Sequence, residues 1–429
     1  MDKQDDKQER VTPKLRFPEF QTTLGWSNKP LSKLANRITS KNKSGEITRV
    51  FTNSANDGVV DQSDYFDREI ANKDNLNGYY IIELGDYVYN PRISTTAPVG
   101  PISKNKIAKG VMSPLYTVFR FHQTDNDFYE HYFKTNCWHK YLQHVSNSGA
   151  RHDRMNITND DFMAMPVPTL SHKEQQKIAD CLSSIDELIN FREQKLAALK
   201  QHKKGLMQQL FPSHNDLQAS KQAIVYPKLR FPQFKDCKGW EVVRISDLLV
   251  EKKRPVKLEN ETEYCLVTVK RRHGGITLRE VAKGKEIKVQ SQFRVFTDDF
   301  LISKRQIVHC ACGVLPKELD GSIVSNEYSV LNAKENVNIT FFNYFCHQPI
   351  VEKSFLDCSS GIVIEKMLFK LDEWMKQEFY FPKNPKEQQA IADCLSSLDK
   401  LINEENEQIG RLKDHKKGLM QQLFPIFRN

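Results

Sequence analysis

Residues 173–184 read KEQQKIADCLSS, and residues 386–397 repeat this stretch except that Ala390 replaces Lys177. Further along, HKKGLMQQLFP at residues 202–212 recurs unchanged at residues 415–425. Upstream of each helical stretch, PKLRFP precedes a Gly-Trp pair, once from Pro13 and once from Pro227. The chain is therefore one module written twice: a proline-rich stem, a variable block and a near-identical final block.

The two final blocks are predicted to be long helices. Ser171 and Asn384 are typical N-cap residues, and Glu174 and Glu387 stand three positions later, where a capping box places its glutamate. Each block ends in Phe-Pro, which marks a helix stop. About 38 residues at ~1.5 Å per residue would give a rod of ~57 Å.

Apolar residues in both blocks are spaced alternately by four and three positions, which is typical of a coiled-coil seam. The predicted helix-pair seam consists of Ile178, Leu182, Ile185, Ile189, Arg192, Leu196, Leu199, Leu206, Ile391, Leu395, Leu398, Ile402, Glu405, Ile409, Leu412 and Leu419.

One seam position is charged in both copies, as Arg192 in the first and Glu405 in the second. If the helices are antiparallel and related by a pseudo-dyad, these two side chains face each other. The same register places Ile178 near Leu419, Ile185 near Leu412, and Leu199 near Leu398. The alternative is that each helix packs only on its own domain.

The variable blocks mix short aromatic and β-branched runs with short amphipathic segments. Strands are expected at residues 79–82 and 323–324, and helices at residues 31–38 and 245–250. The expected fold is α/β (α+β), with two mixed α/β domains separated by two long antiparallel coiled-coil helices. The predicted boundaries are a disordered tail at 1–12, recognition domains at 13–170 and 227–384, long helices at 171–212 and 385–425, and a linker at 213–226.

The formal net charge of +9 and the pI near 8.9 favour a polyanionic partner such as nucleic acid. Basic and polar clusters in expected loops are the candidate DNA contacts, although any one of them could be a solvated surface charge. Arginine can bridge the O6 and N7 atoms of guanine, whereas lysine and serine more often hold phosphates. The candidates are Lys41, Lys43, Arg92, Ser94, Thr95, Arg151, His152, Arg154, Lys270, Arg271, Arg272, His273, Lys304, Arg305 and Ser360.

Motifs for enzymatic chemistry are missing from the sequence. There is no Gly-x-x-x-x-Gly-Lys-Ser/Thr loop for ATP and no Gly-x-Gly-x-x-Gly motif after a strand. Asn90-Pro91-Arg92 only partly resembles the Asn-Pro-Pro-Tyr motif of adenine methyltransferases. We therefore expect no catalytic residue in this chain.

The nine cysteines include no Cys-x-x-Cys pair, which argues against a disulfide framework or a zinc site. Cys310 and Cys312 are interpreted as small apolar residues in a strand, and we expect no metal and a reducing cytoplasm. The polar N-terminus is unlike a secretory signal. No apolar run reaches the length of a transmembrane helix.

The duplicated stem and helix motifs, from Pro13 to Pro425, resemble the type I restriction–modification specificity subunit family. The resemblance implies that two recognition domains each read half of a split DNA site, while antiparallel helices fix the spacing. It also implies a bacterial or archaeal complex with two methyltransferase subunits, which use S-adenosylmethionine on adenine N6, and with restriction subunits, which use ATP and Mg²⁺. The chain itself would carry no cofactor.

Two other classes of function stay open at this point. A coiled-coil scaffold that binds only protein would show no salt-sensitive DNA binding. A fused methyltransferase would bind S-adenosylmethionine as an isolated chain, although the cofactor motifs are missing.

Overall fold

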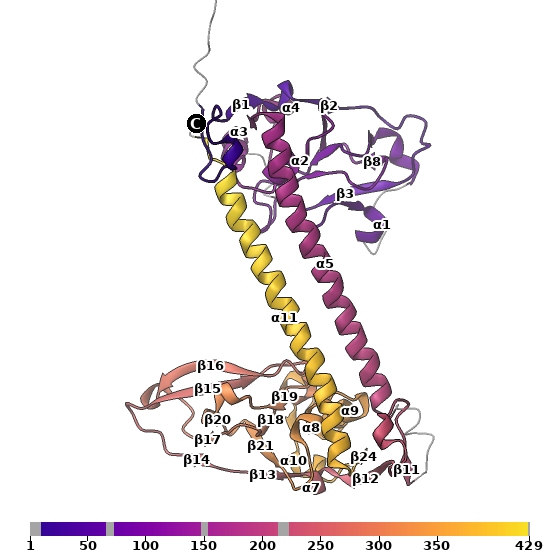
Figure 1. Ribbon diagram of the computed structural model, residues 1–429, viewed down its shortest axis with the longest axis vertical. Helices are drawn as coiled ribbons and strands as arrows, with labels where there is room; N and C mark the ends of the chain where they lie inside the picture. Colours follow the sequence, from indigo (N-terminus) through magenta and orange to yellow (C-terminus); the bar gives the residue numbers. More distant parts are fainter. Residues whose placement is uncertain (1–9, 66–72, 147–152, 213–222, 428–429) are drawn as a thin grey trace, which may run out of the picture. The chain divides into compact units, whose positions relative to one another are not determined.

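The computed structural model describes residues 10–65, 73–146, 153–212 and 223–427. They form two compact units: unit 1 contains the described residues of 1–193 and 407–429, and unit 2 is Gln194–Asn406. Two 39-residue helices, α5 (His172–Leu210) and α11 (Pro385–Leu423), each contribute residues to both units. Figure 1 labels both helices and some of the strands of each unit. The long helices expected from the repeated blocks are confirmed.

Unit 1 contains two four-stranded sheets, β2-β9-β6-β7 and β4-β3-β8-β5, and the pair β1-β10. The strands are β1 (Ser27–Pro30), β2 (Ala35–Ile38), β3 (Val50–Ser54), β4 (Gly58–Asp61), β5 (Tyr80–Ile82), β6 (Tyr87–Tyr89), β7 (Ile102–Lys104), β8 (Gly110–Met112), β9 (Thr117–Phe121) and β10 (Pro166–Thr169). The short helices are η1 (Pro18–Phe20), η2 (Leu31–Lys33), α1 (Gln62–Tyr65), η3 (Lys73–Gly78), α2 (Asp127–Phe133), α3 (His139–Val145) and α4 (Asn159–Met163).

Unit 2 contains the sheets β11-β12-β24, β13-β21-β18-β19 and β14-β17-β20-β15-β16, and the pair β22-β23. The strands are β11 (Ile224–Val225), β12 (Trp240–Arg244), β13 (Leu249–Glu251), β14 (Pro255–Val256), β15 (Glu263–Val269), β16 (Ile276–Lys283), β17 (Gln292–Arg294), β18 (Phe300–Ser303), β19 (Cys312–Val314), β20 (Ile323–Ser325), β21 (Tyr328–Ala333), β22 (Ser359–Ser360), β23 (Leu368–Phe369) and β24 (Glu378–Phe381). The short helices are η4 (Pro232–Phe234), α7 (Ile245–Leu248), η5 (Gly284–Glu286), η6 (Ile307–His309), η7 (Lys317–Leu319), α8 (Ile339–Phe345), α9 (Pro349–Asp357), η8 (Ile364–Lys366) and α10 (Leu371–Trp374).

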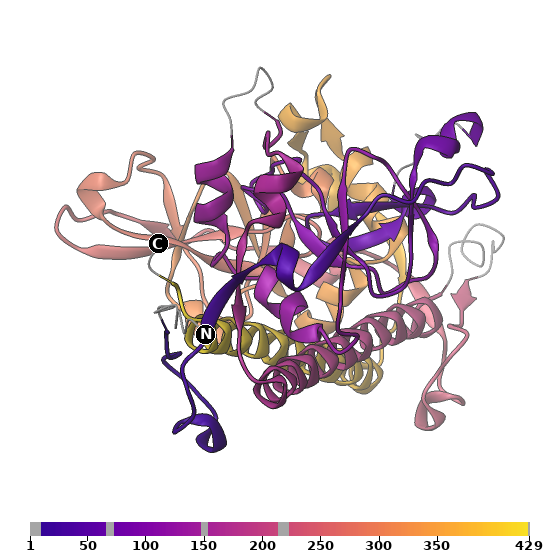
Figure 2. The same cartoon turned by 90° about the horizontal axis from the view of Figure 1, so that it is seen from above.

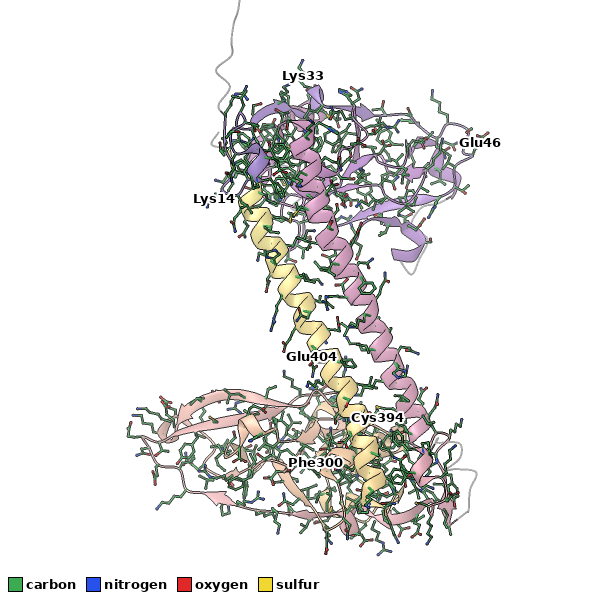
Figure 3. The ribbon with its side chains drawn as sticks, viewed as in Figure 1. Lys14, Lys33, Glu46, Phe300, Cys394 and Glu404 are labelled. Carbon is green, nitrogen blue, oxygen red and sulfur yellow. The ribbon has the colours of Figure 1, made fainter. Side chains whose placement is uncertain are left out.

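The duplication of the sequence is matched by a duplication of the fold. Sheet β2-β9-β6-β7 of unit 1 corresponds strand for strand to sheet β13-β21-β18-β19 of unit 2. Phe300, at the start of β18, is fully buried and lies inside the sheet-bearing part of unit 2 (Figure 3). The sheets and short helices of both units confirm the mixed α/β class expected for each variable block.

Each unit has an apolar core that contains the end of the other repeat's helix. In unit 1, Ile178 and Leu182 from the start of α5 share a core with Leu423 at the end of α11 and with Phe424, which follows it. In unit 2 the roles are reversed, because Leu210 at the end of α5 joins the core near the start of α11. The interpretation in which each helix packs only on its own domain is therefore wrong.

Within each unit, the segments of α5 and α11 run antiparallel. In unit 1, Lys416 binds Asp186 and Lys413 binds Glu193, the latter at 2.7 Å, so residue numbers rise along one helix and fall along the other. The same order holds in unit 2, where Lys203 binds Asp399 at 2.6 Å and Lys195 binds Glu405. The two segments of unit 1 lie side by side in both views (Figures 1 and 2).

Every residue of the predicted seam is buried or half-buried in the structure. Neighbouring positions such as Lys200 and Glu404 are exposed, as the heptad spacing requires. Ile178 and Leu419 belong to the same apolar core, in agreement with the predicted register. Arg192 and Glu405 belong to different units, so their pairing stays a prediction.

The stem motif holds each long helix at its start. Arg16, from the first PKLRFP, donates from Nε and Nη2 to both carboxylate oxygens of Glu174, at 2.7 and 2.8 Å. Arg230 binds Glu387 in the same way in unit 2. Ser171 does cap α5 by accepting from the Glu174 amide, but the expected return bond of a capping box is replaced by the arginine pair.

Three local expectations are wrong in whole or in part. Residues 31–38 form a 3-10 turn followed by β2, whereas the helix expected at residues 245–250 is confirmed only for the four residues of α7, after which β13 begins. Pairing with β9 and β21 overrides the helical pattern in these segments, because sheet hydrogen bonds outweigh weak local propensity. Cys310 lies outside any strand, as the left-handed residue that ends η6, whereas Cys312 begins β19 as expected.

Other expectations concern strands and the membrane. The strands expected at residues 79–82 and 323–324 are confirmed as β5 and β20. Among the residues that the structure describes, no helix is both long and apolar enough to cross a membrane. Most of the predicted tail and linker, at residues 1–9 and 213–222, lies outside the described residues.

Candidate nucleic-acid interface

Unit 1 brings Arg92 and Arg154 together from distant parts of the sequence. The two residues form an isolated antiparallel β-bridge, flanked by a hydrogen bond from the Met155 amide to the Pro91 carbonyl at 2.8 Å. Both arginines line a cavity of about 220 Å³ whose wall also includes Tyr116. Two guanidinium groups beside an aromatic ring are suited to hydrogen bonding and stacking with bases or phosphates.

The Lys41–Lys43 loop is tied to the same region. Lys41 forms an isolated bridge with Tyr80, and the Asn42 amide donates to the Tyr79 carbonyl at 3.0 Å. Tyr79 in turn lines the cavity that contains the two arginines. Lys41 and Lys43 are both exposed, so their ammonium groups are accessible to a polyanion.

Two of the four remaining candidates of unit 1 belong to a loop that the structure describes. Ser94 and Thr95 are exposed in the loop after Arg92, where the Ser94 and Ala97 backbones hydrogen-bond to each other. Arg151 and His152 lie outside the described residues.

Unit 2 brings three separate candidate clusters together. Lys270–His273 form the turn between β15 and β16, and Arg271 donates to Gln306 at 2.8 Å and to Glu365 at 2.9 Å. The carbonyl of Lys304 accepts from the Phe369 amide at 3.0 Å, next to the β22-β23 pair that contains Ser360. These contacts join the hairpin turn, the loop after β18 and the β22-β23 pair.

The two units are built alike at this junction. The bond from Met155 to Pro91 in unit 1 corresponds to the bond from Phe369 to Lys304 in unit 2. Pro91 and Lys304 lie in the loops after the equivalent strands β6 and β18, and Met155 and Phe369 lie shortly after the candidates Arg154 and Ser360. The backbone junction is shared while its side chains differ, as two readers of different base sequences require.

The candidates of unit 2 are not equally accessible. Lys270 and Arg272 are exposed and form no ion pair within the described part of the chain. Arg305 is bound to Glu327 at 2.7 Å, and the Lys304 ammonium donates to the Asn326 carbonyl at 2.8 Å. Ser360 is exposed. Among the candidate cations of unit 2, Lys270 and Arg272 are therefore exposed without an ion pair in the described part of the chain.

The side chain of His273 points into the protein instead of toward solvent. Its Nε2 lies 2.8 Å from a Glu352 oxygen, and its ring stacks on His347 with centroids 3.9 Å apart. Burial opposes the charged form, but hydrogen bonds with Cys310, Cys312 and Glu352 raise the pKa of His273 to about 10. A hydrogen bond with Cys346 lowers the pKa of the Cys312 thiol. These contacts within the protein explain the position of the His273 side chain, and no contact with DNA is needed to explain it.

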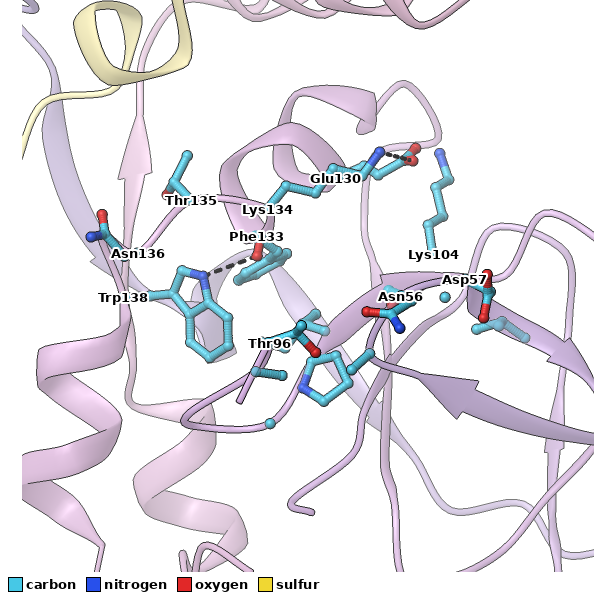
Figure 4. A pocket seen from close by; sticks show the side chains of 18 of the residues that line it. Asn56, Asp57, Thr96, Lys104, Glu130, Phe133, Lys134, Thr135, Asn136 and Trp138 are labelled. Atoms are coloured by element: carbon cyan, nitrogen blue, oxygen red, sulfur yellow. Dashed lines mark hydrogen bonds and ion pairs between the residues drawn. The ribbon is translucent and has the colours of Figure 1, made fainter. Parts of the chain in front are cut away.

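A larger cavity of about 500 Å³ in unit 1 is lined by Lys104, Lys134 and Glu130 (Figure 4). Its lysines are already neutralised, because Lys104 binds Asp127 at 2.6 Å and Lys134 binds Glu130 at 3.1 Å. The Trp138 indole at its edge donates to the Phe133 carbonyl. Lys106 shares the same Glu130 carboxylate at 2.7 Å, so the cations that line this cavity are all engaged in ion pairs.

Comparison with protein families settles the class of protein. A family model described as the type I restriction modification DNA specificity domain matches residues 31–201 and again residues 237–411. The chain belongs to this specificity family. As a specificity subunit it carries the DNA specificity domain twice and is not itself catalytic.

A solved specificity subunit has a similar fold. The crystal structure of the type I restriction-modification system S subunit from M. genitalium is 12% identical, with a TM-score of 0.55 over 97% of this chain and 100% of that chain. A structure described as the basis of complex assembly and conformational transition of the type I R-M system is 14% identical, covers 94% and 98%, and has a TM-score of 0.49. The HsdS subunit from Thermoanaerobacter tengcongensis is 13% identical, covers 93% and 96%, and has a TM-score of 0.43.

Proposed function

We propose that this specificity subunit reads a bipartite duplex DNA site, one half with each unit, and directs methyltransferase and restriction subunits to it. One observation carries the proposal: the same backbone junction recurs in both units with different basic side chains around it. Unit 1 presents Arg92 and Arg154 beside its junction. In unit 2, Arg305 is equivalent to Arg92 but is bound to Glu327, and the nearby β15-β16 turn presents the exposed Lys270 and Arg272. Phosphate contacts position a protein on DNA, and differing side chains give each half its sequence.

The two long helices are proposed to set the distance between the two half-sites. Each has 39 residues, so at about 1.5 Å per residue each is roughly 58 Å long. Half-sites on one face of B-DNA lie about 34 Å apart or a multiple of it. Because α5 and α11 both run from one unit into the other, a change in helix length is expected to change the number of unspecified base pairs.

The catalytic work is assigned to partner subunits. Two methyltransferase subunits would bring S-adenosylmethionine for adenine N6 methylation, and restriction subunits would bring ATP and Mg²⁺. The equivalent lysines Lys204 and Lys417 are exposed, while their neighbours Lys203 and Lys416 pair with α11 and α5 carboxylates. Repeated exposed charges of this kind suit two copies of the same partner.

The decisive experiment maps N6-methyladenine in cells that carry this chain with its methyltransferase. Residues 26–169 are exchanged for the matching block of another such subunit, and the original chain serves as the control. We expect one half of the methylated motif to change and the other half, with the spacer, to stay the same. A change in both halves, or methylation without any sequence preference, would contradict the proposal.

A further inference from the structure

Three potential metal ligands from distant segments meet in unit 2. They are His273 in the β15-β16 turn, Cys310 at the end of η6, and Glu352 on α9. One ligand atom from each residue lies within 4.8 Å of the other two, and all three residues are half-buried. Cys310 is 37 residues after His273 and 42 residues before Glu352, so the three residues do not form a short metal-binding motif in the sequence.

The backbone holds this arrangement in strained conformations. His273 and Cys310 have φ angles of 52° and 55°, and Arg272 beside them has 56°. The Arg272 and His273 amides donate to the His309 and Cys310 carbonyls, at 2.7 and 2.9 Å. Left-handed conformations are unfavourable for residues other than glycine, and such strain is often found at functional sites. The strained backbone brings His273 and Cys310 face to face.

The donor atoms are those that Zn²⁺ prefers. Imidazole nitrogen, thiolate sulfur and carboxylate oxygen are its usual protein ligands, at about 2.0 to 2.3 Å. A tetrahedral ion with such bonds places its ligand atoms roughly 3.3 to 3.8 Å apart. To surround an ion, the Nε2–Glu352 separation of 2.8 Å would have to widen and any separation near the 4.8 Å limit would have to shorten, which side-chain shifts of about 1 Å achieve.

The surroundings of His273 already fix the orientation of its ring. Nε2 faces Glu352 at 2.8 Å, while Nδ1 lies 3.8 Å from the Cys312 sulfur. A metal shared with Glu352 would take Nε2 and leave the Nδ1 proton facing Cys312. Ligating histidines are usually oriented by a hydrogen bond from this second ring nitrogen, here to a sulfur in place of the usual oxygen acceptor. The ring of His347, stacked at 3.9 Å, holds the imidazole from one face, and its own buried Nε2 has no hydrogen-bond partner in the described part of the chain.

We propose that unit 2 binds one Zn²⁺ through His273, Cys310 and Glu352, with the fourth coordination position open. The ion would tie the β15-β16 turn to η6 and α9. The exposed Lys270 and Arg272 belong to that turn, so the metal would fix the loop that presents them.

The test uses the full chain, purified from zinc-supplemented cells and dialysed against metal-free buffer. Elemental analysis should find about one equivalent of zinc per chain. Titration of chelator-stripped protein with Co²⁺ should give a thiolate-to-cobalt charge-transfer band. Cys310→Ser should lose the band, and His273→Gln and Glu352→Gln should lose the bound zinc. The matched control Cys265→Ser removes an exposed cysteine of the same unit and should bind zinc like the original chain.

Thermal unfolding keeps the result interpretable if a variant is destabilised. Ligand binding to the folded state alone raises the melting temperature, so added zinc should raise it for the stripped original chain and for Cys265→Ser. It should not raise it for Cys310→Ser that circular dichroism shows to be folded. Absence of stoichiometric zinc from the original chain would overturn the proposal. So would zinc binding that Cys310→Ser and His273→Gln leave unchanged.

Discussion

Arg16 and Glu174 form a two-armed ion pair across 158 residues of sequence, with side chains that are only 4% and 1% exposed. The Trp26 indole donates to the same carboxylate at 3.1 Å, so the stem, the start of the first domain and the start of α5 meet at one glutamate. The equivalent pair, Arg230 and Glu387, is similarly buried. The conserved arrangement within the chain explains why PKLRFP is repeated unchanged in front of two otherwise different domains.

Replacing Arg16 with Met is expected to destabilise unit 1 by roughly 3–5 kcal/mol, because it leaves the Glu174 carboxylate buried without its partner. The double variant Arg16→Met/Glu174→Gln should lose less than the sum of the two single changes. Unfolding in urea, followed by hydrogen-exchange mass spectrometry of peptides from each unit, measures the stability of the two units separately. Equal loss of protection in units 1 and 2 from Arg16→Met would contradict this local role.

Phe424→Ala is expected to weaken unit 1 although the residue belongs to the second repeat. Its ring lies 6.3 Å from Trp26 and 5.4 Å from Phe128, and it is 3% exposed. Removing such a buried ring costs about 3–5 kcal/mol. Hydrogen exchange should increase in the strands of unit 1, whereas Phe191→Ala, at an exposed site on α5, should have little effect.

Alanine substitutions at Arg92 and Arg154 are expected to relax one half of the recognised site. Each base-reading arginine contributes about 1–3 kcal/mol to discrimination between the correct base and a wrong one. Each lost phosphate contact reduces the slope of the logarithm of the binding constant against the logarithm of the salt concentration by about 1. Lys270→Ala/Arg272→Ala should affect the other half. Binding of the methyltransferase complex is measured over a salt series, with Lys14→Ala in the exposed stem as the control (Figure 3). Equal effects on both halves would refute the assignment.

Acid is expected to destabilise unit 1 through His131. Burial, assisted by the ammonium groups of Lys134 and Lys416 and opposed by Glu130 and Asp186, lowers the pKa of His131 to about 4. An unfolded histidine titrates near pH 6.5, so below that pH the unfolded state binds a proton that the folded state does not bind until the pH approaches 4. Stability is therefore lost as pH falls from about 6.5 to 4, by roughly 2 kcal/mol at pH 5.

The matching experiment compares urea unfolding between pH 7.5 and pH 5 in the original chain and in His131→Gln. The variant should lose less stability over this range, and His122→Gln, which alters an exposed histidine, should behave like the original. The same pH dependence in all three proteins would show that His131 does not act in this way.

Part of the candidate interface could be predicted from the sequence. Arg92, Arg154 and Lys270–His273 were recognisable as polar clusters in loops. Their meeting with other loops was not, because it depends on single backbone hydrogen bonds such as the one from Phe369 to Lys304. The inward side chain of His273 was also hidden, since its partners Cys310 and Glu352 are remote in sequence.

The sequence by itself determined the duplication, the two long helices and the apolar seam, because repeats and heptad spacing are properties of order along the chain. Only the tertiary structure decided that each domain is completed by the other repeat's helix end, with Phe211 against Trp240 and Phe424 against Trp26. A helix buries an apolar stripe wherever its partner lies, and the choice between its own domain and the other is made by packing, which periodicity does not encode.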